Sequence, residues 1–169
     1  MLDRSASGRE IVLQAGDYEA RIVTVGAGLA GLRYRGHELI VSHAVNECPP
    51  GYLGKVLMPW PNRVAGGSYS WEGSSYDLPV DEPAFGTALH GFVAFQEWEI
   101  AEAETSSVLL CTLIAARYSY PWTLAVYPLQ PGRGHGPHRR AVGDEHRRGH
   151  RPLRRRLPPI PGRRQCQGG

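Results

Sequence analysis

The sequence predicts an all-β fold, and three observations support this. The first is a series of short runs rich in β-branched and aromatic residues, separated by turns that contain glycine. The second is that no stretch keeps apolar residues at positions i, i+3, i+4 and i+7 over the length of a helix. The third is the content of 14 prolines and 21 glycines in 169 residues, which is typical of strands joined by long loops.

The expected strands follow one another along the chain. Four short runs come first, and each is followed by a turn. A hairpin comes next, because large apolar residues alternate with polar ones on both of its arms, Tyr69–Trp71 and Tyr76–Leu78. An antiparallel pair with its turn near Thr105 follows. The other expected strands are Glu10–Ala15, Tyr18–Val25, Leu29–Tyr34, Glu38–Ser42, Glu97–Ala103 and Ser107–Ala115.

The glycines at 26, 28 and 31 match the G-x-G-x-x-G pattern of dinucleotide-binding proteins. That chemistry requires a helix whose N-terminus points at the pyrophosphate. Only residues 32–35 separate Gly31 from the next turn at Gly36, which leaves no room for a crossover helix. We therefore interpret this segment as two strands joined by a glycine-rich turn.

Charge and aromatic content divide the chain into two parts. Residues 1–127 carry 8 Lys and Arg, 14 Asp and Glu, and every aromatic residue. Residues 128–169 carry 11 Arg, two acidic residues and no aromatic residue. Because the second part has too little apolar surface to offset the entropy of ordering it, we predict a folded part over 1–127 and a disordered Arg/Gly/Pro-rich tail over 128–169.

Residues 51–98 contain the candidate site. Asn62 and Arg63 lie between a Pro-Trp-Pro turn and a Gly-Gly turn, and His90 precedes Gly91. Phenylalanines stand close to His90 in the sequence, at positions 85, 92 and 95. Aromatic faces stack on sugar rings and these polar groups bind hydroxyls, so the residues suit a sugar site. On the residues alone, a surface role for Arg63 and a structural role for His90 stay open.

The same residues resemble the aldose 1-epimerase (galactose mutarotase) family, in its bacterial branch. The resemblance extends from about Ile11 to Val126 and includes the upstream segments 16–20 and 25–29. Its motifs are Leu57-x-Pro59-Trp60-Pro61-Asn62-Arg63-Val64-x-x-Gly67-x-Tyr69-x-Trp71-x-Gly73-x-x-Tyr76-x-Leu78, then Leu89-His90-Gly91-Phe92 and Trp98.

The resemblance implies that residues 1–127 are the N-terminal part of a large antiparallel β-sandwich of the galactose mutarotase-like type. It implies an isomerase that interconverts the α and β anomers of a free aldose of the glucose or galactose class, without a cofactor. It assigns Asn62, Arg63 and His90 to substrate binding. The family's general acid, a His in a His-Pro-Tyr motif, and its base, a Glu near the C-terminus, are absent, so we expect this chain to be inactive.

The tail has the composition that GC-rich codons give out of frame. Reading the last two bases of each codon with the first base of the next, segment 153–161 permits Tyr-Gly-Ala-Gly-Phe-His-Pro-Tyr-Leu. This peptide contains the missing His-Pro-Tyr motif. We therefore interpret the chain as shifted in frame near Val126–Pro128.

Two other hypotheses stay open. One is a carbohydrate-binding fragment without turnover, and the other is an Arg-rich nucleic-acid-binding protein. The tail lacks interleaved aromatic residues, and its His pairs at 135/138 and 146/150 lack a metal-site pattern, so we expect neither nucleic acid nor metal to bind. The longest apolar run, 108–116, is too short to cross a membrane, and the start has no apolar leader. Three widely spaced cysteines (Cys48, Cys111, Cys166) suggest no disulfide framework and favour the cytoplasm.

Overall fold

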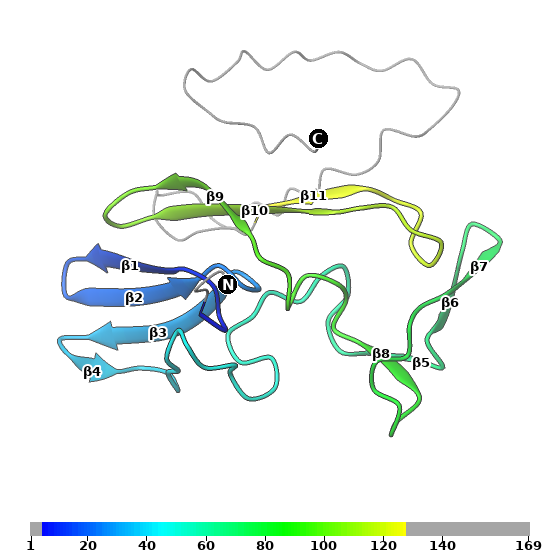
Figure 1. The fold of residues 1–169 in the computed structure, drawn as a ribbon, viewed down its shortest axis with the longest axis horizontal. Helices are drawn as coiled ribbons and strands as arrows, with labels where there is room; N and C mark the ends of the chain where they lie inside the picture. Colours follow the sequence, from blue (N-terminus) through cyan, green and yellow to red (C-terminus); the bar gives the residue numbers. More distant parts are fainter. Residues whose placement is uncertain (1–4, 128–169) are drawn as a thin grey trace, which may run out of the picture.

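The computed structural model describes residues 5–127, and all of their regular secondary structure is β-strand. Strands β1 (Glu10–Ala15), β2 (Tyr18–Val23), β3 (Gly28–Tyr34) and β4 (His37–Glu38) form an antiparallel meander in that order. Short turns at 16–17 and 35–36 join successive strands, as the glycines there predict. This sheet forms one end of the molecule in Figure 1.

A second sheet lies beside the first (Figure 1). It has the order β11-β10-β9 and consists of β9 (Glu99–Ala103), β10 (Val108–Ile114) and β11 (Leu124–Val126), all antiparallel. The backbone ties the two sheets together, because the amide of Gln14 donates to the carbonyl of Thr105 at 2.8 Å and that of Trp98 to Thr24 at 2.9 Å.

Two small antiparallel pairs form the other end of the molecule (Figure 1). One pairs β5 (Arg63–Ala65) with β8 (Thr87–Leu89), and the other is the hairpin of β6 (Ser68–Trp71) and β7 (Ser74–Asp77). The hairpin packs by aromatic contacts, since the rings of Tyr69 and Tyr76 stack with centroids 5.2 Å apart.

The core lies between the two larger sheets. Trp98 is completely buried, and its indole N–H donates to the carbonyl of Val93 at 3.2 Å, so its one polar group is satisfied. Side chains from β1 and β2, including Ile11 and Ile22, pack against this cluster. The buried cluster consists of Val93, Trp98, Val108, Leu110, Ile114 and Val126.

The structure confirms the all-β prediction, and most of the expected strands form within a few residues of their predicted limits. The strand expected over Glu38–Ser42 is wrong, since pairing ends at Glu38. Leu39 and Val41 are exposed, so the apolar alternation there faces no core. The Ser42 hydroxyl instead donates to the Glu38 carboxylate at 2.5 Å.

The glycine pattern at 26–31 lies on a turn between two antiparallel strands, as predicted. Gly31 is in the middle of β3, where a Cβ atom would lie 2.8 Å from the Arg21 side chain. Arg21 crosses the sheet at this point and donates to the carbonyl oxygens of Ala30 and His43. Here glycine makes room for a half-buried arginine rather than for a nucleotide.

Cys48 is an exposed free thiol, and Cys111 is buried in β10. The expectation that the cysteines form no disulfide framework stays a prediction, and so does the cytoplasmic location. The described residues contain no helix long and apolar enough to cross a membrane. The expectations for the tail, 128–169, lie outside the described residues.

Replacing Trp98 by alanine should lower the free energy of unfolding by about 3–5 kcal/mol, because it empties the centre of the core. Urea unfolding followed by circular dichroism measures this loss. Tyr118→Ala is the control, since the Tyr118 side chain is fully exposed and its removal should cost less than about 0.5 kcal/mol. Equal losses for the two variants would contradict the core described here.

Candidate functional site

Asn62 and His90 are joined by two hydrogen bonds at one end of the β5–β8 pair. The amide of His90 donates to the Asn62 carbonyl at 2.9 Å, and the amide of Asn62 donates to the His90 Nδ1 atom at 2.7 Å. Both residues have positive φ, 62° and 61°, which is uncommon for residues other than glycine. The β5–β8 ladder ends at the pair Arg63 and Leu89, and the next two residues, Asn62 and His90, are joined by these two hydrogen bonds.

Gly91 fixes the position of His90 from the other side. It forms a bridge with Met58, and a Cβ atom at position 91 would lie 1.9 Å from the Met58 carbonyl oxygen. Its φ of +73° also disfavours any L side chain. The amide of Phe92 then donates to the same carbonyl at 2.7 Å. The His-Gly pair of the sequence thus reflects a close backbone approach that only glycine permits.

The hydrogen bond to Asn62 selects the tautomer of His90. Because Nδ1 accepts the amide proton, a neutral imidazole must carry its own proton on Nε2. The Tyr52 ring meets the imidazole edge to face, with centroids 4.4 Å apart and an interplanar angle of 68°. In this neutral form Nε2–H is the donor that the His90 ring presents.

Arg63 is held by a loop rather than left free. Its Nε donates to Glu82 Oε2 at 2.5 Å and its Nη2 donates to Glu82 Oε1 at 2.7 Å, which is a bidentate pair. The guanidinium carbon lies 5.1 Å from the centre of the Phe85 ring. The hydroxyl of Thr87 donates to Glu82 Oε2 at 2.7 Å.

These contacts change the proton affinities of the paired groups. The hydrogen bonds from Arg63 and then from Thr87 lower the pKa of Glu82 to about 2. The hydrogen bond to Glu82 raises the pKa of Arg63. Burial, followed by the charges of Asp81 and Glu82, raises the pKa of Tyr52. At neutral pH the site therefore holds an ionised carboxylate, a guanidinium and a neutral phenol.

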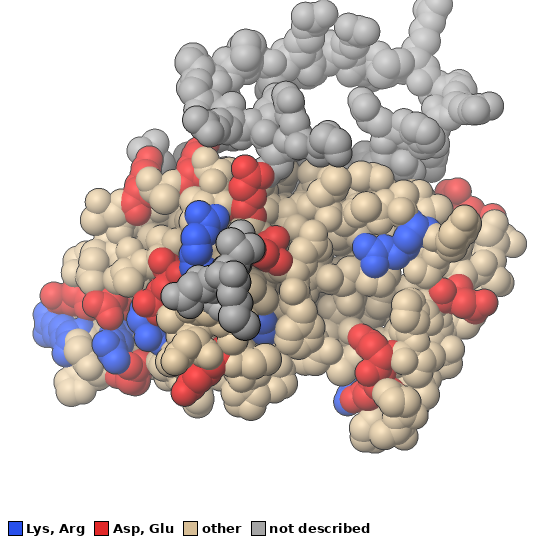
Figure 2. Space-filling view, in the orientation of Figure 1, with Lys and Arg blue, Asp and Glu red and all other residues tan. Residues whose placement is uncertain are grey.

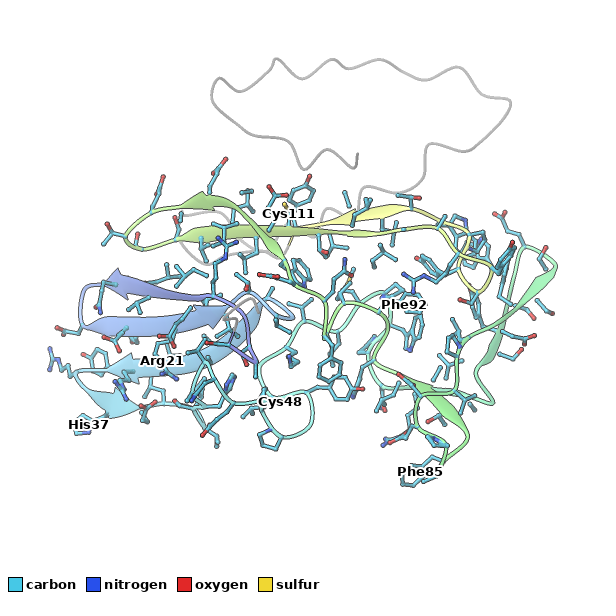
Figure 3. The ribbon with its side chains drawn as sticks, in the orientation of Figure 1. Arg21, His37, Cys48, Phe85, Phe92 and Cys111 are labelled. Atoms are coloured by element: carbon cyan, nitrogen blue, oxygen red, sulfur yellow. The ribbon has the colours of Figure 1, made fainter. Side chains whose placement is uncertain are left out.

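The aromatic residues expected near His90 divide into two groups. Phe85 and Phe95 are exposed, at 69% and 58%, and Phe95 packs against Tyr52 at 5.2 Å. Phe92, labelled in Figure 3, is half-buried and contacts the Trp60 ring, with centroids 4.9 Å apart, and the Arg117 guanidinium, at 4.1 Å. Two of the three rings are thus exposed, and the third packs against other side chains.

Sequence reasoning brings Asn62, Arg63 and His90 to one place, but it misses three neighbours. Glu82 clamps Arg63, Tyr52 contacts His90, and the Asp81 carboxylate accepts the amide of Leu89 at 2.7 Å. Two adjacent acids before a proline were the available indication of this loop. Among the described residues, no group of three or more His, Cys, Asp or Glu could hold a metal ion.

The visible charges do not form a basic surface. Figure 2 shows most of the Lys and Arg side chains at the β1–β4 end, where acidic side chains lie among them. Within residues 1–127 the acidic side chains outnumber the Lys and Arg side chains, 14 to 8. On the face that Figure 2 shows, the described Lys and Arg side chains therefore form no continuous basic patch.

Residues 9–127 match the family model described as aldose 1-epimerase. The chain belongs to the aldose 1-epimerase family. It is 46% identical over 131 residues to the uncharacterized protein YihR of Escherichia coli (strain K12), covering 76% of this chain and 42% of that protein. The chain thus spans about two fifths of the length of this curated relative.

Solved structures support the fold. A GalM/aldose epimerase homologue from C. elegans matches with a TM-score of 0.62 at 18% identity, over 69% of this chain and 39% of that one. Galactose 1-epimerase from Lactobacillus acidophilus NCFM matches with a TM-score of 0.60 at 20% identity, over 70% and 38%. The fold is therefore galactose mutarotase-like, as the sequence motifs imply.

Gly91→Ala should destabilise the protein by more than about 2 kcal/mol, because it adds a backbone clash to the cost of a positive φ. Gly36→Ala is the matched control: it also has positive φ, but open space surrounds the added Cβ. It should cost about 1 kcal/mol. Urea unfolding of both variants measures the free energy of unfolding, and the difference between them reports the contact with Met58. Equal losses of stability in the two variants would contradict that contact.

The Arg63–Glu82 pair should make stability depend on acid pH. The pKa of Glu82 is about 2 in the folded protein against an ordinary value of 4.5, so the pair stabilises the fold above about pH 4.5. This contribution is lost as the pH falls toward 2. The stability difference between the wild type and Glu82→Gln should therefore shrink below pH 4.5, in urea unfolding at pH 7, 4 and 3. For the control Glu104→Gln we expect no such convergence, and a gap for Glu82→Gln that stays constant to pH 3 would contradict the pairing.

Proposed function

We propose that this chain carries a sugar-binding site of an aldose 1-epimerase, formed by Asn62, Arg63 and His90. The observation that carries the proposal is the reciprocal hydrogen bonding of Asn62 and His90 next to Arg63. Family membership over residues 9–127 supports a free aldose of the glucose or galactose class as the ligand.

The chemistry of the three residues suits a polyhydroxylated ring. The Nε2–H of His90 and the outer N–H groups of Arg63 are donors that sugar oxygens accept. The exposed ring of Phe95 and the half-buried ring of Tyr52 offer apolar faces to the C–H surface of a pyranose. The site therefore combines directional donors with stacking surfaces.

The reaction that we propose for the family site is mutarotation. A general base removes the proton of the anomeric hydroxyl while a general acid protonates the ring oxygen, and the ring opens. After rotation about the C1–C2 bond, closure on the other face reverses both proton transfers. Neither step requires a redox change or a metal ion.

In this scheme the described residues bind and orient the sugar, and they do not supply both proton-transfer groups. His90 can donate from Nε2, but its Nδ1 is occupied by the amide of Asn62. We therefore propose that the chain binds aldoses with little turnover. A purely carbohydrate-binding role is the second candidate, and the exposed Phe95 ring favours it equally.

The frame shift stays a proposal, because it concerns residues outside the described part. The family match ends at residue 127, close to the predicted shift near Val126–Pro128. Sequencing the coding DNA tests it: a single-base difference near this codon would restore the His-Pro-Tyr segment. A clean open frame that encodes the arginine-rich residues in every clone would reject it.

Aldose binding should depend on Arg63 and His90. For Arg63→Ala and His90→Ala, the dissociation constants of D-galactose and D-glucose should rise roughly 10- to 100-fold, because each change removes hydrogen bonds to the ligand. Saturation-transfer NMR with the full chain measures this. Arg33→Ala, on the exposed face of β3, is the matched control and should bind as the wild type does. Unchanged binding by both site variants would reject the site.

Mutarotation by the 169-residue chain should stay close to the buffer rate. Each positioned acid or base contributes typically ~10²–10⁴-fold, and the chain lacks the family pair. Polarimetry on freshly dissolved α-D-glucose or α-D-galactose gives the rate, and a frame-restored protein is the positive control. Substantial, saturable mutarotation by the short chain that His90→Ala abolishes would place the chemistry within residues 51–98.

A further inference from the structure

Glu82 is fixed by its own loop before it meets Arg63. The backbone amide of Glu82 donates to the carbonyl of Thr87 at 3.1 Å, and the amide of Thr87 donates back at 3.3 Å. The amide of Phe85 closes a turn on the Glu82 carbonyl at 3.1 Å. The buried Thr87 then gives its hydroxyl to the carboxylate. The carboxylate orientation is therefore set by residues 82–87 themselves.

This loop contacts the Arg63 guanidinium in two ways. The carboxylate of Glu82 occupies the Nε–H and one Nη2–H, and the ring of Phe85 lies against the guanidinium plane at 5.1 Å. Of the five N–H donors of an arginine, three are left for other partners. Figure 3 shows Phe85 at the tip of the loop that projects from β8.

The pair of Glu82 and Arg63, here called the clamp, lies close to His90. The charges of Asp81 and Glu82 act on Tyr52, whose ring touches His90. A long arginine side chain on the surface otherwise samples many rotamers, and ordering it during binding weakens the affinity. A clamp formed before binding removes that penalty.

We propose that Glu82 is a positioning residue that fixes the Arg63 guanidinium, so that its three remaining N–H groups face the sugar site beside His90. The inference rests on the proposed function, because it assumes that Arg63 binds an aldose. Glu82 acts through Arg63 and needs no contact with the ligand.

The test is a double-mutant cycle on aldose binding by the full chain, with D-galactose and D-glucose as probes. Glu82→Gln keeps the shape of the side chain but removes its charge, and it should weaken binding about tenfold. Added to Arg63→Ala, the same change should have no further effect. Glu82→Asp keeps the charge and should recover part of the affinity.

Glu38→Gln is the matched control, because Glu38 forms an equally short ion pair with Arg33 on the first sheet, at 2.5 Å. It should bind both sugars as the wild type does. Thr87→Val, which keeps Glu82 but removes the hydroxyl that orients it, should weaken binding by a smaller factor. This variant keeps the inference testable if Glu82→Gln does not fold.

The Nε–H resonance of Arg63 gives a readout that does not depend on sugar. In the wild type it should be protected from exchange, and in Glu82→Gln it should exchange faster. Binding by Glu82→Gln within twofold of the wild type, or a loss that adds in full to that of Arg63→Ala, would overturn the inference. A wild-type chain that binds no aldose while its Arg63 resonance is protected would instead overturn the proposed function.

Discussion

The close approach of two backbone segments at Met58 and Gly91 is the constraint on which the site depends. A glycine at this point lets the Met58 carbonyl meet the chain where a Cβ atom would lie 1.9 Å away. Once the segments are this close, the amide of Phe92 pairs with the same carbonyl, and His90 meets Asn62. The positions of Asn62 and His90 therefore follow from this backbone contact, and the hydrogen bond from the Asn62 amide to His90 Nδ1 adds to it.

The site residues that lie in short local motifs could be predicted from the sequence. Asn62, Arg63 and His90 belong to short motifs between turn residues, so they could be singled out without a structure. Asp81 and Glu82 before a proline indicated a loop, but the pairing of Glu82 with Arg63 could not be predicted, because the two residues lie 19 positions apart and no periodicity connects them. Tyr52 was missed for the same reason: its contact with His90 depends on how a loop folds back, which neither composition nor alternation encodes.

The fold divides in the same way. Strands such as β1 and β10, whose side chains alternate or form an apolar run, could be predicted because burial imposes that pattern. Strands β5, β8 and β11 have three residues each and were not expected. Long-range packing brings a partner to each of them, and three residues are too few to show an alternating pattern in the sequence.

The Arg63–Glu82 pair shows why geometry and stability should be weighed separately. Its side chains are 46% and 18% exposed, and ion pairs with this degree of solvent contact contribute little to the free energy of folding. Yet the pair is bidentate, and both the Phe85 ring and the Thr87 hydroxyl support it. These contacts restrict the rotamers of the exposed Arg63 side chain, but they add little to the free energy of folding. A surface arginine ordered in this way is suited to presenting hydrogen-bond donors in a fixed direction, which recognition of a sugar requires and folding does not.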